Sequence, residues 1–189
     1  MKKTVSAIIC AVLLLLAAGC SAKPTEKEIN TYIGEGQMMI IKNLLYTNEE
    51  LYGKVFISSH LPLVPERKMI KGGKEYAVVE SDLYGSFADI EACVRATYTA
   101  DAADKLLSEH DFYADMGDLL CFDISREFES QPAPEWDIEK MKTVSASDAE
   151  CVFSIDYTGS DGKKSTAEVR VVCESGEWHL DNLYPVSAN

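Results

Sequence analysis

The sequence predicts an α+β fold, in which N-terminal helices are followed by a C-terminal antiparallel sheet within a single domain. Apolar residues recur at helical spacing in segments before residue 110, and residues that favour helix caps precede these segments. Beyond residue 119 the apolar residues alternate with period two, as in strands that are buried on one face. We expect a leader at residues 1–19, a tether at 20–27 and the domain at 28–189.

The first twenty residues have the features of an export signal. Lys2 and Lys3 precede an apolar run at residues 7–18, which is too short to span a bilayer because a spanning helix needs roughly 20 apolar residues. The run ends in Leu16-Ala-Ala-Gly-Cys20, which resembles the lipobox of bacterial lipoproteins. This resemblance implies acylation of Cys20, with each buried methylene contributing about 0.8 kcal/mol to anchoring. The protein is then expected on the extracytoplasmic face of the cell membrane; the alternative is an ordinary secretory signal with a chance cysteine.

The composition is strongly acidic. The chain has 31 Asp and Glu residues against 18 Lys and Arg residues, and without Lys2 and Lys3 the 16 basic residues that remain give a net charge of −15. Such a surface repels nucleic acids and anionic lipid headgroups, and the sequence contains no basic cluster that would offset the repulsion. The charge therefore argues against a nucleic-acid partner and favours basic partners or cations.

The first third of the domain is expected to contain helices and one hairpin. A capping-box pattern at residues 25–28 opens the first helix. The apolar positions of this helix are Ile29, Ile33, Ile40 and Leu44. A second helical segment is expected at Glu49–Val55, and the two prolines of His60–Arg67 predict a loop. Residues 68–79 read as a hairpin, because Gly72-Gly73 supplies the positive φ angles of a two-residue turn.

Two further helices are expected before residue 110. Ser86 and Asp89 make a capping pair for the first of them. Its apolar stripe consists of Phe87, Ile90, Cys93 or Val94, and Thr97. Thr99 is expected to cap the second helix, in which Asp101 and Lys105 are spaced to pair on the solvent side. Its inward positions are Ala102, Ala103, Leu106 and Leu107.

The remainder of the chain is expected to form strands. Leu120, Phe122 and Ile124 share one face of a strand, and residues 142–185 read as an antiparallel meander. The strands of this meander are predicted at Ala149–Tyr157, Lys163–Glu174 and Glu177–Tyr184. If Tyr157 pairs with Lys163, one buried face carries Cys151, Phe153, Ile155, Val169, Val171, Cys173, Trp178 and Leu180. A shift of the pairing by one residue would move the apolar side chains of one strand to the solvent face. The pattern therefore determines which face of the sheet is buried.

Four cysteines follow the tether, and four cysteines allow three full pairings. They are Cys93, Cys121, Cys151 and Cys173. The predicted register separates Cys151 and Cys173 by four residues along the strands, roughly 13 Å, whereas a disulfide needs Cα atoms within about 7 Å. A bond between these two is therefore disfavoured. The cysteines then act as small buried apolar side chains, or Cys93 bridges a helix to the sheet.

The sequence contains no recognisable catalytic or metal-binding pattern. The zinc-protease, nucleophile-elbow, phosphate-loop and calcium-loop patterns are absent from it. Glu109-His110-Asp111 is a cluster of chain neighbours at a helix end, and such side chains fan out around the helix instead of converging on a metal. We interpret the cluster as a solvated surface. No catalytic residue, metal, cofactor or enzymatic activity is expected.

The region from Tyr84 to Asp123 resembles the IseA-type inhibitors of D,L-endopeptidases in Gram-positive bacteria. The matching positions are Tyr98-Thr99, Ala102-Ala103, Leu106-Leu107, Gly117 and Leu119. The resemblance extends over roughly residues 75–184. It implies a domain that binds and blocks cell-wall endopeptidases of the NlpC/P60 type and has no catalytic residues of its own. The lipobox and the four cysteines are additions to this family's pattern.

A second resemblance concerns the last predicted strand. Gly176-Glu-Trp-His-Leu-Asp181 is similar to the final strand of NTF2-like domains, in which helices pack on a curved sheet. That fold can enclose an apolar pocket between the helices and the sheet. The alternative function is therefore an NTF2-like lipoprotein that binds a small ligand.

The leader, the charge and the first resemblance together predict a membrane-anchored extracytoplasmic protein. We expect it to inhibit or modulate peptidoglycan D,L-endopeptidases by steric occlusion, with a cell-wall hydrolase as partner and the N-terminal lipid as the only membrane contact. Tight association needs apolar anchors, because exposed ion pairs contribute only about 0–1 kcal/mol each. Candidate anchors in the predicted loops are Trp136, Leu61 and Leu63.

Overall fold

The computed structural model describes residues 33–184. The leader, Cys20 and the capping pattern at residues 25–28 lie outside the described residues. The helical elements are α3 (Glu35–Glu50), the π-helix η1 (Leu51–Phe56), α4 (Phe87–Thr97), α5 (Ala100–Glu109) and the 3₁₀-helix η2 (Ile138–Lys140). The strands are β1 (Leu63–Lys71), β2 (Lys74–Val79), β3 (Tyr113–Met116), β4 (Leu119–Asp123), β5 (Glu135–Trp136), β6 (Lys142–Ala146), β7 (Glu150–Thr158), β8 (Lys164–Glu174) and β9 (Glu177–Leu180).

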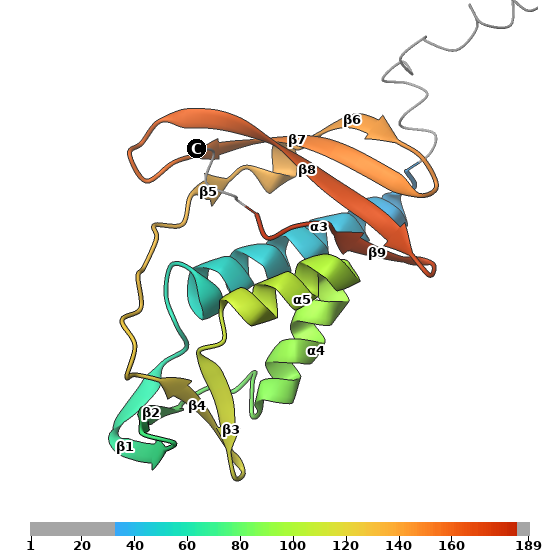
Figure 1. Ribbon diagram of the computed structural model, residues 1–189. Coiled ribbons are helices and arrows are strands. Elements are labelled where there is room, and N and C mark those ends of the chain that lie inside the picture. Colours follow the sequence, from blue (N-terminus) through green and yellow to red (C-terminus); the bar gives the residue numbers. More distant parts are fainter. Residues whose placement is uncertain (1–32, 185–189) are drawn as a thin grey trace, which may run out of the picture.

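The helices form a layer between two antiparallel sheets (Figure 1). The smaller sheet has the strand order β1-β2-β4-β3, and in the larger sheet β7 pairs with both β5 and β6 before the order continues through β8 to β9. The predicted α+β class is therefore confirmed. The sequence indicated β4 and the hairpin of β1 and β2, but not that they pair with each other in a separate sheet.

One continuous core connects the helix layer to both sheets. The buried side chains in it include Ile41 and Leu45 of α3, Ile90 and Val94 of α4, Leu120 and Phe122 of β4, Phe153 and Ile155 of β7, and Val169 and Val171 of β8. Burying such a side chain contributes roughly 1.5–3 kcal/mol. The three layers therefore stabilise one another.

The first strand begins where a loop was expected. β1 opens at Leu63, inside the segment His60–Arg67 whose prolines predicted a loop, and that prediction is wrong. The pairing register of β1 shifts between Val64 and Lys68, so Pro65 lies in an irregular stretch of a strand at the sheet edge. A proline is compatible with an edge strand or a bulge, because no ladder bond needs its missing N–H.

The hairpin turn after β1 was predicted correctly. Gly72 and Gly73 adopt φ angles of 61° and 81°, and Lys71 pairs with Lys74 across the turn.

The first helix buries a different stripe from the expected one. The inward residues of α3 are Ile41, Leu45 and Asn48, whereas Ile40 is 48% exposed. The helix begins at Glu35, where the side chain of Gln37 accepts a hydrogen bond from the backbone N–H of Gly34. The expected second helical segment exists, but it continues α3 directly as the π-helix η1.

The predicted face of the larger sheet is confirmed, although its register differs by two residues. Tyr157 pairs with Ser165 instead of Lys163, because Lys163 belongs to the turn, where its C=O accepts a hydrogen bond from the N–H of Gly159 (2.8 Å). A shift by two residues keeps every side chain on its own face. Of the eight predicted inward residues, Cys173 and Trp178 are half-buried and the other six are buried.

The two predicted helix caps have different outcomes. The hydroxyl of Ser86 accepts from the N–H of Asp89 (3.3 Å) and the Asp89 carboxylate accepts from the N–H of Ser86 (2.8 Å), which confirms the capping box of α4. Thr99 precedes α5 without a side-chain cap. Its N–H donates instead to the C=O of Leu180 (2.8 Å), so Thr99 ties the corner between α4 and α5 to the last strand.

Candidate functional site

The junction of α3 and η1 lies beside three surface cavities. In η1 the C=O of Tyr52 accepts from the N–H groups of Ile57 (3.1 Å) and Ser58 (3.0 Å), which widens the last turn. Short π-helical turns are frequent at functional sites. Tyr52 lines two of the cavities, and the third is lined by residues of the same segment together with Tyr84.

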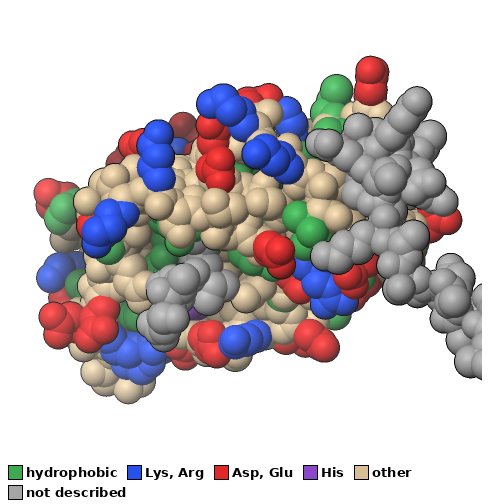
Figure 2. Space-filling view, turned by 90° about the horizontal axis from the view of Figure 1, so that it is seen from above, with side chains coloured by type: hydrophobic (Ala, Val, Ile, Leu, Met, Phe, Trp, Pro, Cys, Tyr) green, Lys and Arg blue, Asp and Glu red, His purple; other side chains and the backbone are tan. Residues whose placement is uncertain are grey.

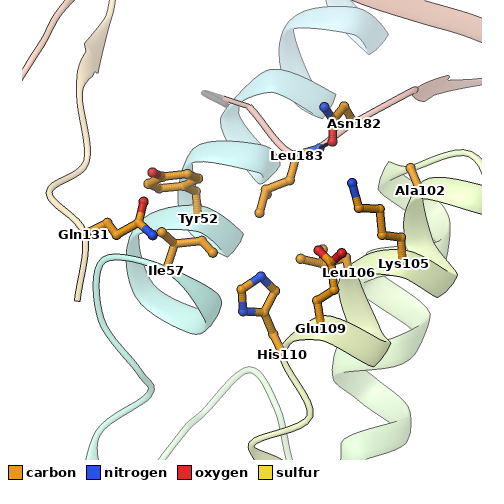
Figure 3. A pocket seen from close by; sticks show the side chains of 10 residues that line it. All are labelled: Tyr52, Ile57, Ala102, Lys105, Leu106, Glu109, His110, Gln131, Asn182 and Leu183. Carbon is orange, nitrogen blue, oxygen red and sulfur yellow. Dashed lines mark hydrogen bonds between the residues drawn. The ribbon is translucent and has the colours of Figure 1, made fainter. Parts of the chain in front are cut away.

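The first cavity, which we call the His110 cavity, has a volume of about 180 Å³. Figure 3 shows Lys105, Glu109 and His110 on one side of it, with Tyr52 on the opposite side. The apolar part of the lining includes the buried Leu106. The cavity therefore combines an apolar floor with polar groups at its edge, as small binding sites commonly do.

The charged groups of the His110 cavity are not paired with each other. Lys105 and Glu109 form no ion pair within residues 33–184, and neither does the expected pair of Asp101 and Lys105. Burial lowers the pKa of His110, and the nearby Glu109 carboxylate only partly opposes this effect. The imidazole is therefore neutral at pH 7, and it can donate or accept a hydrogen bond.

The second cavity, which we call the Trp136 cavity, has a volume of about 270 Å³ and is also lined by Tyr52. Its lining residues are Glu49, Tyr52, Ala133, Pro134, Glu135 and Trp136. The indole of Trp136 stacks on the ring of Tyr157 at a centroid distance of 5.5 Å, and this contact fixes its orientation. Burial raises the pKa of Glu49, although the carboxylate accepts a hydrogen bond from the backbone N–H of Trp136.

The third cavity, which we call the Tyr84 cavity, has a volume of about 280 Å³ and is mostly apolar. Tyr46, Leu83 and Tyr84 contribute to it, and Leu83 is 79% exposed. An exposed leucine beside aromatic rings is the kind of feature that is used in protein–protein contacts. An ion pair between Lys54 and Glu50 (2.7 Å) borders this cavity.

The structure places the three predicted anchor residues in different surroundings. Trp136 is half-buried in β5 and lines the cavity named after it. Leu61 is buried in the core, so it is not the exposed anchor that the loop prediction implied. Leu63 is half-buried at the start of β1 and packs against the same core. Leu61 and Trp136 therefore both line cavities, but of the three residues only Trp136 combines a place at a cavity with a half-exposed side chain.

The four cysteines of the domain are unpaired thiols. Cys151 lies opposite Val171, so Cys173 is two residues from the position opposite Cys151, instead of the predicted four, and no disulfide joins the two cysteines. Burial raises the pKa of the Cys121 and Cys151 thiols. A buried thiol with a raised pKa is a poor nucleophile.

The Glu109-His110-Asp111 cluster diverges in the structure. The carboxylate of Asp111 pairs with Arg126 (2.8 Å), whereas Glu109 and His110 line the His110 cavity. Within residues 33–184, no three His, Cys, Asp or Glu side chains are grouped so that they could hold a metal ion. Sequence reasoning missed the cavity, because its opposite wall comes from η1 and from residues close to the C-terminus.

The fold and these cavities define an α+β protein whose candidate binding sites open at the surface beside one helix. No protein-family model matches the chain, and no curated protein is significantly similar to it. Among residues 33–184, no helix has the combination of length and apolar character that a membrane span requires.

Proposed function

We propose that the protein is a membrane-tethered extracytoplasmic binding protein that restrains peptidoglycan D,L-endopeptidases of the NlpC/P60 type by steric occlusion. The lipobox-like leader and the resemblance of residues 75–184 to IseA-type inhibitors motivate this proposal. The observation that supports it best is the location of the cavities. The three cavities open at the surface beside α3 and η1, and a fourth, of about 400 Å³, opens at the surface beside β5, β7 and β8. The space between the helices and the larger sheet is filled.

The filled interior argues against the alternative of a small-ligand carrier. Ligand pockets of that kind usually have volumes of about 300–1,000 Å³. In this protein the side chains between the helices and the larger sheet are almost completely inaccessible, and they include Ile41, Tyr98, Phe153, Val169 and Leu180. A ligand could enter only by displacing close-packed core residues, which is costly.

The residues that carry the resemblance have structural roles. Tyr98, Ala103 and Leu106 are buried in the core, and Gly117 adopts a φ of 66° in the turn between β3 and β4. These positions support the fold, and Ala102 and Leu106 also line the His110 cavity. The surface around the three cavities is therefore the proposed docking face.

The charges favour a basic partner at this face. Over the larger sheet, basic and acidic side chains are intermixed (Figure 2), and Arg170 pairs with both Glu150 (2.5 Å) and Asp181 (3.3 Å). The Trp136 cavity, by contrast, presents Glu49 and Glu135 with no basic residue in its lining. An unbalanced acidic site speeds the encounter with a basic cleft, and the effect decreases as salt increases.

The test is an inhibition assay with the purified full chain in mild detergent and NlpC/P60 catalytic domains. Cleavage of peptidoglycan stem peptides should fall with added protein until it reaches a plateau, and higher salt should weaken the effect. Trp136→Ala should raise the concentration needed for half inhibition. Ile70→Ala is the matched control, because Ile70 is 80% exposed and lines none of the three cavities. Undiminished cleavage at excess protein and low salt would rule out the proposed inhibition.

A further inference from the structure

We infer that the Trp136 cavity binds one organic cation, namely the ammonium group of a lysine or the guanidinium group of an arginine side chain. The cavity combines two carboxylates, two aromatic residues and a free phenol hydroxyl around one opening. That a partner protein carries this cation rests on the proposed function. The recognition chemistry of the cavity rests on the structure alone.

The two carboxylates of the cavity lack a counterion. Neither Glu49 nor Glu135 forms an ion pair within the described part of the chain. The nearby Glu50 and Glu139, which lie outside the cavity, pair with lysines at 2.7 Å and 2.5 Å. The two carboxylates of the cavity are therefore unpaired among the described residues, whereas Glu50 and Glu139 are compensated; Glu135 also lines a neighbouring cavity to which Lys140 and Lys164 contribute.

The pKa of Glu49 is raised in this setting without a counterion. Burial raises the pKa of Glu49, and the neighbouring Glu50 carboxylate raises it further. Within residues 33–184 its one recorded stabilising contact is the hydrogen bond from the backbone N–H of Trp136. A cation in the cavity would supply the opposite charge that a partly buried carboxylate requires.

Tyr52 provides an independent indication of a ligand. The residue is only 6% exposed, and its hydroxyl forms no hydrogen bond with any described residue. In Figure 3 this hydroxyl lies on the side of Gln131 and points away from His110, although Tyr52 and Gln131 both line the His110 cavity as well. Tyr52 also lines the Trp136 cavity, where its oxygen can accept a hydrogen bond from a bound N–H group.

The remaining lining suits an organic cation better than a metal ion. Calcium takes about 6–8 oxygen ligands, and two carboxylates with one phenol supply too few of them. The rings of Trp136 and Tyr52, with Pro134 and Ala133, form an apolar wall that fits the methylene stem of a basic side chain. A cation near an indole or phenol ring also gains from the ring's negative face.

The test titrates the full chain with n-butylammonium and butylguanidinium, which mimic the two side chains, and with 1-butanol as a neutral isostere. Calorimetry gives the affinity, and the indole N–H signal of Trp136 reports the location, with Trp178→Phe used to assign the two tryptophan signals. Both cations should bind saturably and shift the Trp136 signal, whereas 1-butanol should not. Binding of 1-butanol with equal affinity, or the absence of saturable binding by both cations, would overturn the inference.

Charge variants provide the second part of the test. Glu49→Gln and Glu135→Gln should each weaken cation binding about tenfold, which is the factor for losing one hydrogen bond to a charged group. Glu168→Gln is the matched control, because Glu168 is exposed on β8 and forms no ion pair among the described residues. Equal weakening by all three variants would show a general charge effect and would contradict a defined site.

This test is independent of the inhibition assay, because the probes require no endopeptidase. Cation binding without inhibition would remove the proposed function and keep the site. Inhibition that is unaffected by Glu49→Gln and Glu135→Gln, together with no cation binding, would keep the function and remove the site.

Discussion

A buried asparagine connects α3 to the end of α4 and to the segment that follows β9. Asn48 of α3 is 2% exposed, and its Oδ1 accepts hydrogen bonds from the hydroxyl of Tyr98 (3.0 Å) and the N–H of Tyr184 (2.7 Å). Its amide group donates to the C=O of Tyr184. Tyr98 is itself buried, and its hydroxyl has no other partner among the described residues.

Replacing this asparagine should therefore be costly. Asn48→Ala removes three hydrogen bonds, each with a net contribution of about 1 kcal/mol, and leaves the Tyr98 hydroxyl unpaired at a cost of about 1–3 kcal/mol. The expected loss in the free energy of unfolding is about 4–6 kcal/mol. For a chain of this length, such a loss lowers the melting temperature by roughly 8–24 °C.

The sharper prediction concerns Tyr98→Phe in two backgrounds. In the unmodified protein this change removes one hydrogen bond and should cost about 1 kcal/mol. In the Asn48→Ala background the same change removes an orphaned hydroxyl, so it should be neutral or stabilising by about 1 kcal/mol. The coupling energy in the double-mutant cycle should be about 1–2 kcal/mol.

Urea unfolding of the four proteins, followed by circular dichroism, measures these differences. Asn43→Ala is a suitable control, because Asn43 lies on the same helix but is exposed. If Tyr98→Phe costs the same in both backgrounds, the hydroxyl finds another partner or water, and the reasoning from a single buried acceptor is refuted.

Three further predictions concern a buried charge, the thiols and the anchor. Asp123 is 1% exposed; burial by itself raises its pKa, but hydrogen bonds from Ser125 and Lys74 outweigh this effect and lower it. Because the folded pKa lies below the unfolded value of about 3.9, Asp123 stabilises the protein above that pH, and this contribution is lost as the pH falls through the folded pKa. Asp123→Asn should therefore cost about 2 kcal/mol at pH 7 and much less in strong acid, and urea titrations across pH will show whether the difference instead stays constant. The four thiols of the domain should react with a thiol reagent far more slowly in the native state than in urea, and an intact mass lacking pairs of hydrogens would reveal disulfides instead. Mass spectrometry of the native protein should find an acylated N-terminal Cys20, and a Cys20→Ala variant that stays membrane-bound would contradict the anchor.

Much of the fold could be predicted because local patterns agree with the tertiary structure. The period-two pattern of the last strands survived a two-residue error in register, since that error leaves the buried face unchanged. The loop prediction for His60–Arg67 failed because prolines at an edge strand cost little. The stripe of α3 was misplaced by one position, since Ile40 and Ile41 are both apolar and only packing decides between them.

The candidate site was much harder to predict. Trp136 could be singled out as a tryptophan outside any apolar periodicity, and it does line a cavity. Tyr52 and Glu49 gave no signal, because a π-helical turn has no sequence signature and the cavity walls come from α3 and from a segment some eighty residues later. Contacts between segments so far apart in the chain are set by packing of the whole fold, which local patterns do not report.

The hydrogen bonds between the helix layer and the C-terminal segment limit how early in folding the native structure can be completed. Thr99 is hydrogen-bonded to Leu180, and Asn48 to Tyr184, across 81 and 136 positions of the sequence. Contacts between residues so far apart in the sequence form late in folding, because the entropy of closing a long loop must be overcome before such contacts stabilise the protein. The chain must therefore be available through Tyr184 before α3 has its final partners. A chain truncated before β9 would leave the corner between α4 and α5 without its hydrogen bond to Leu180.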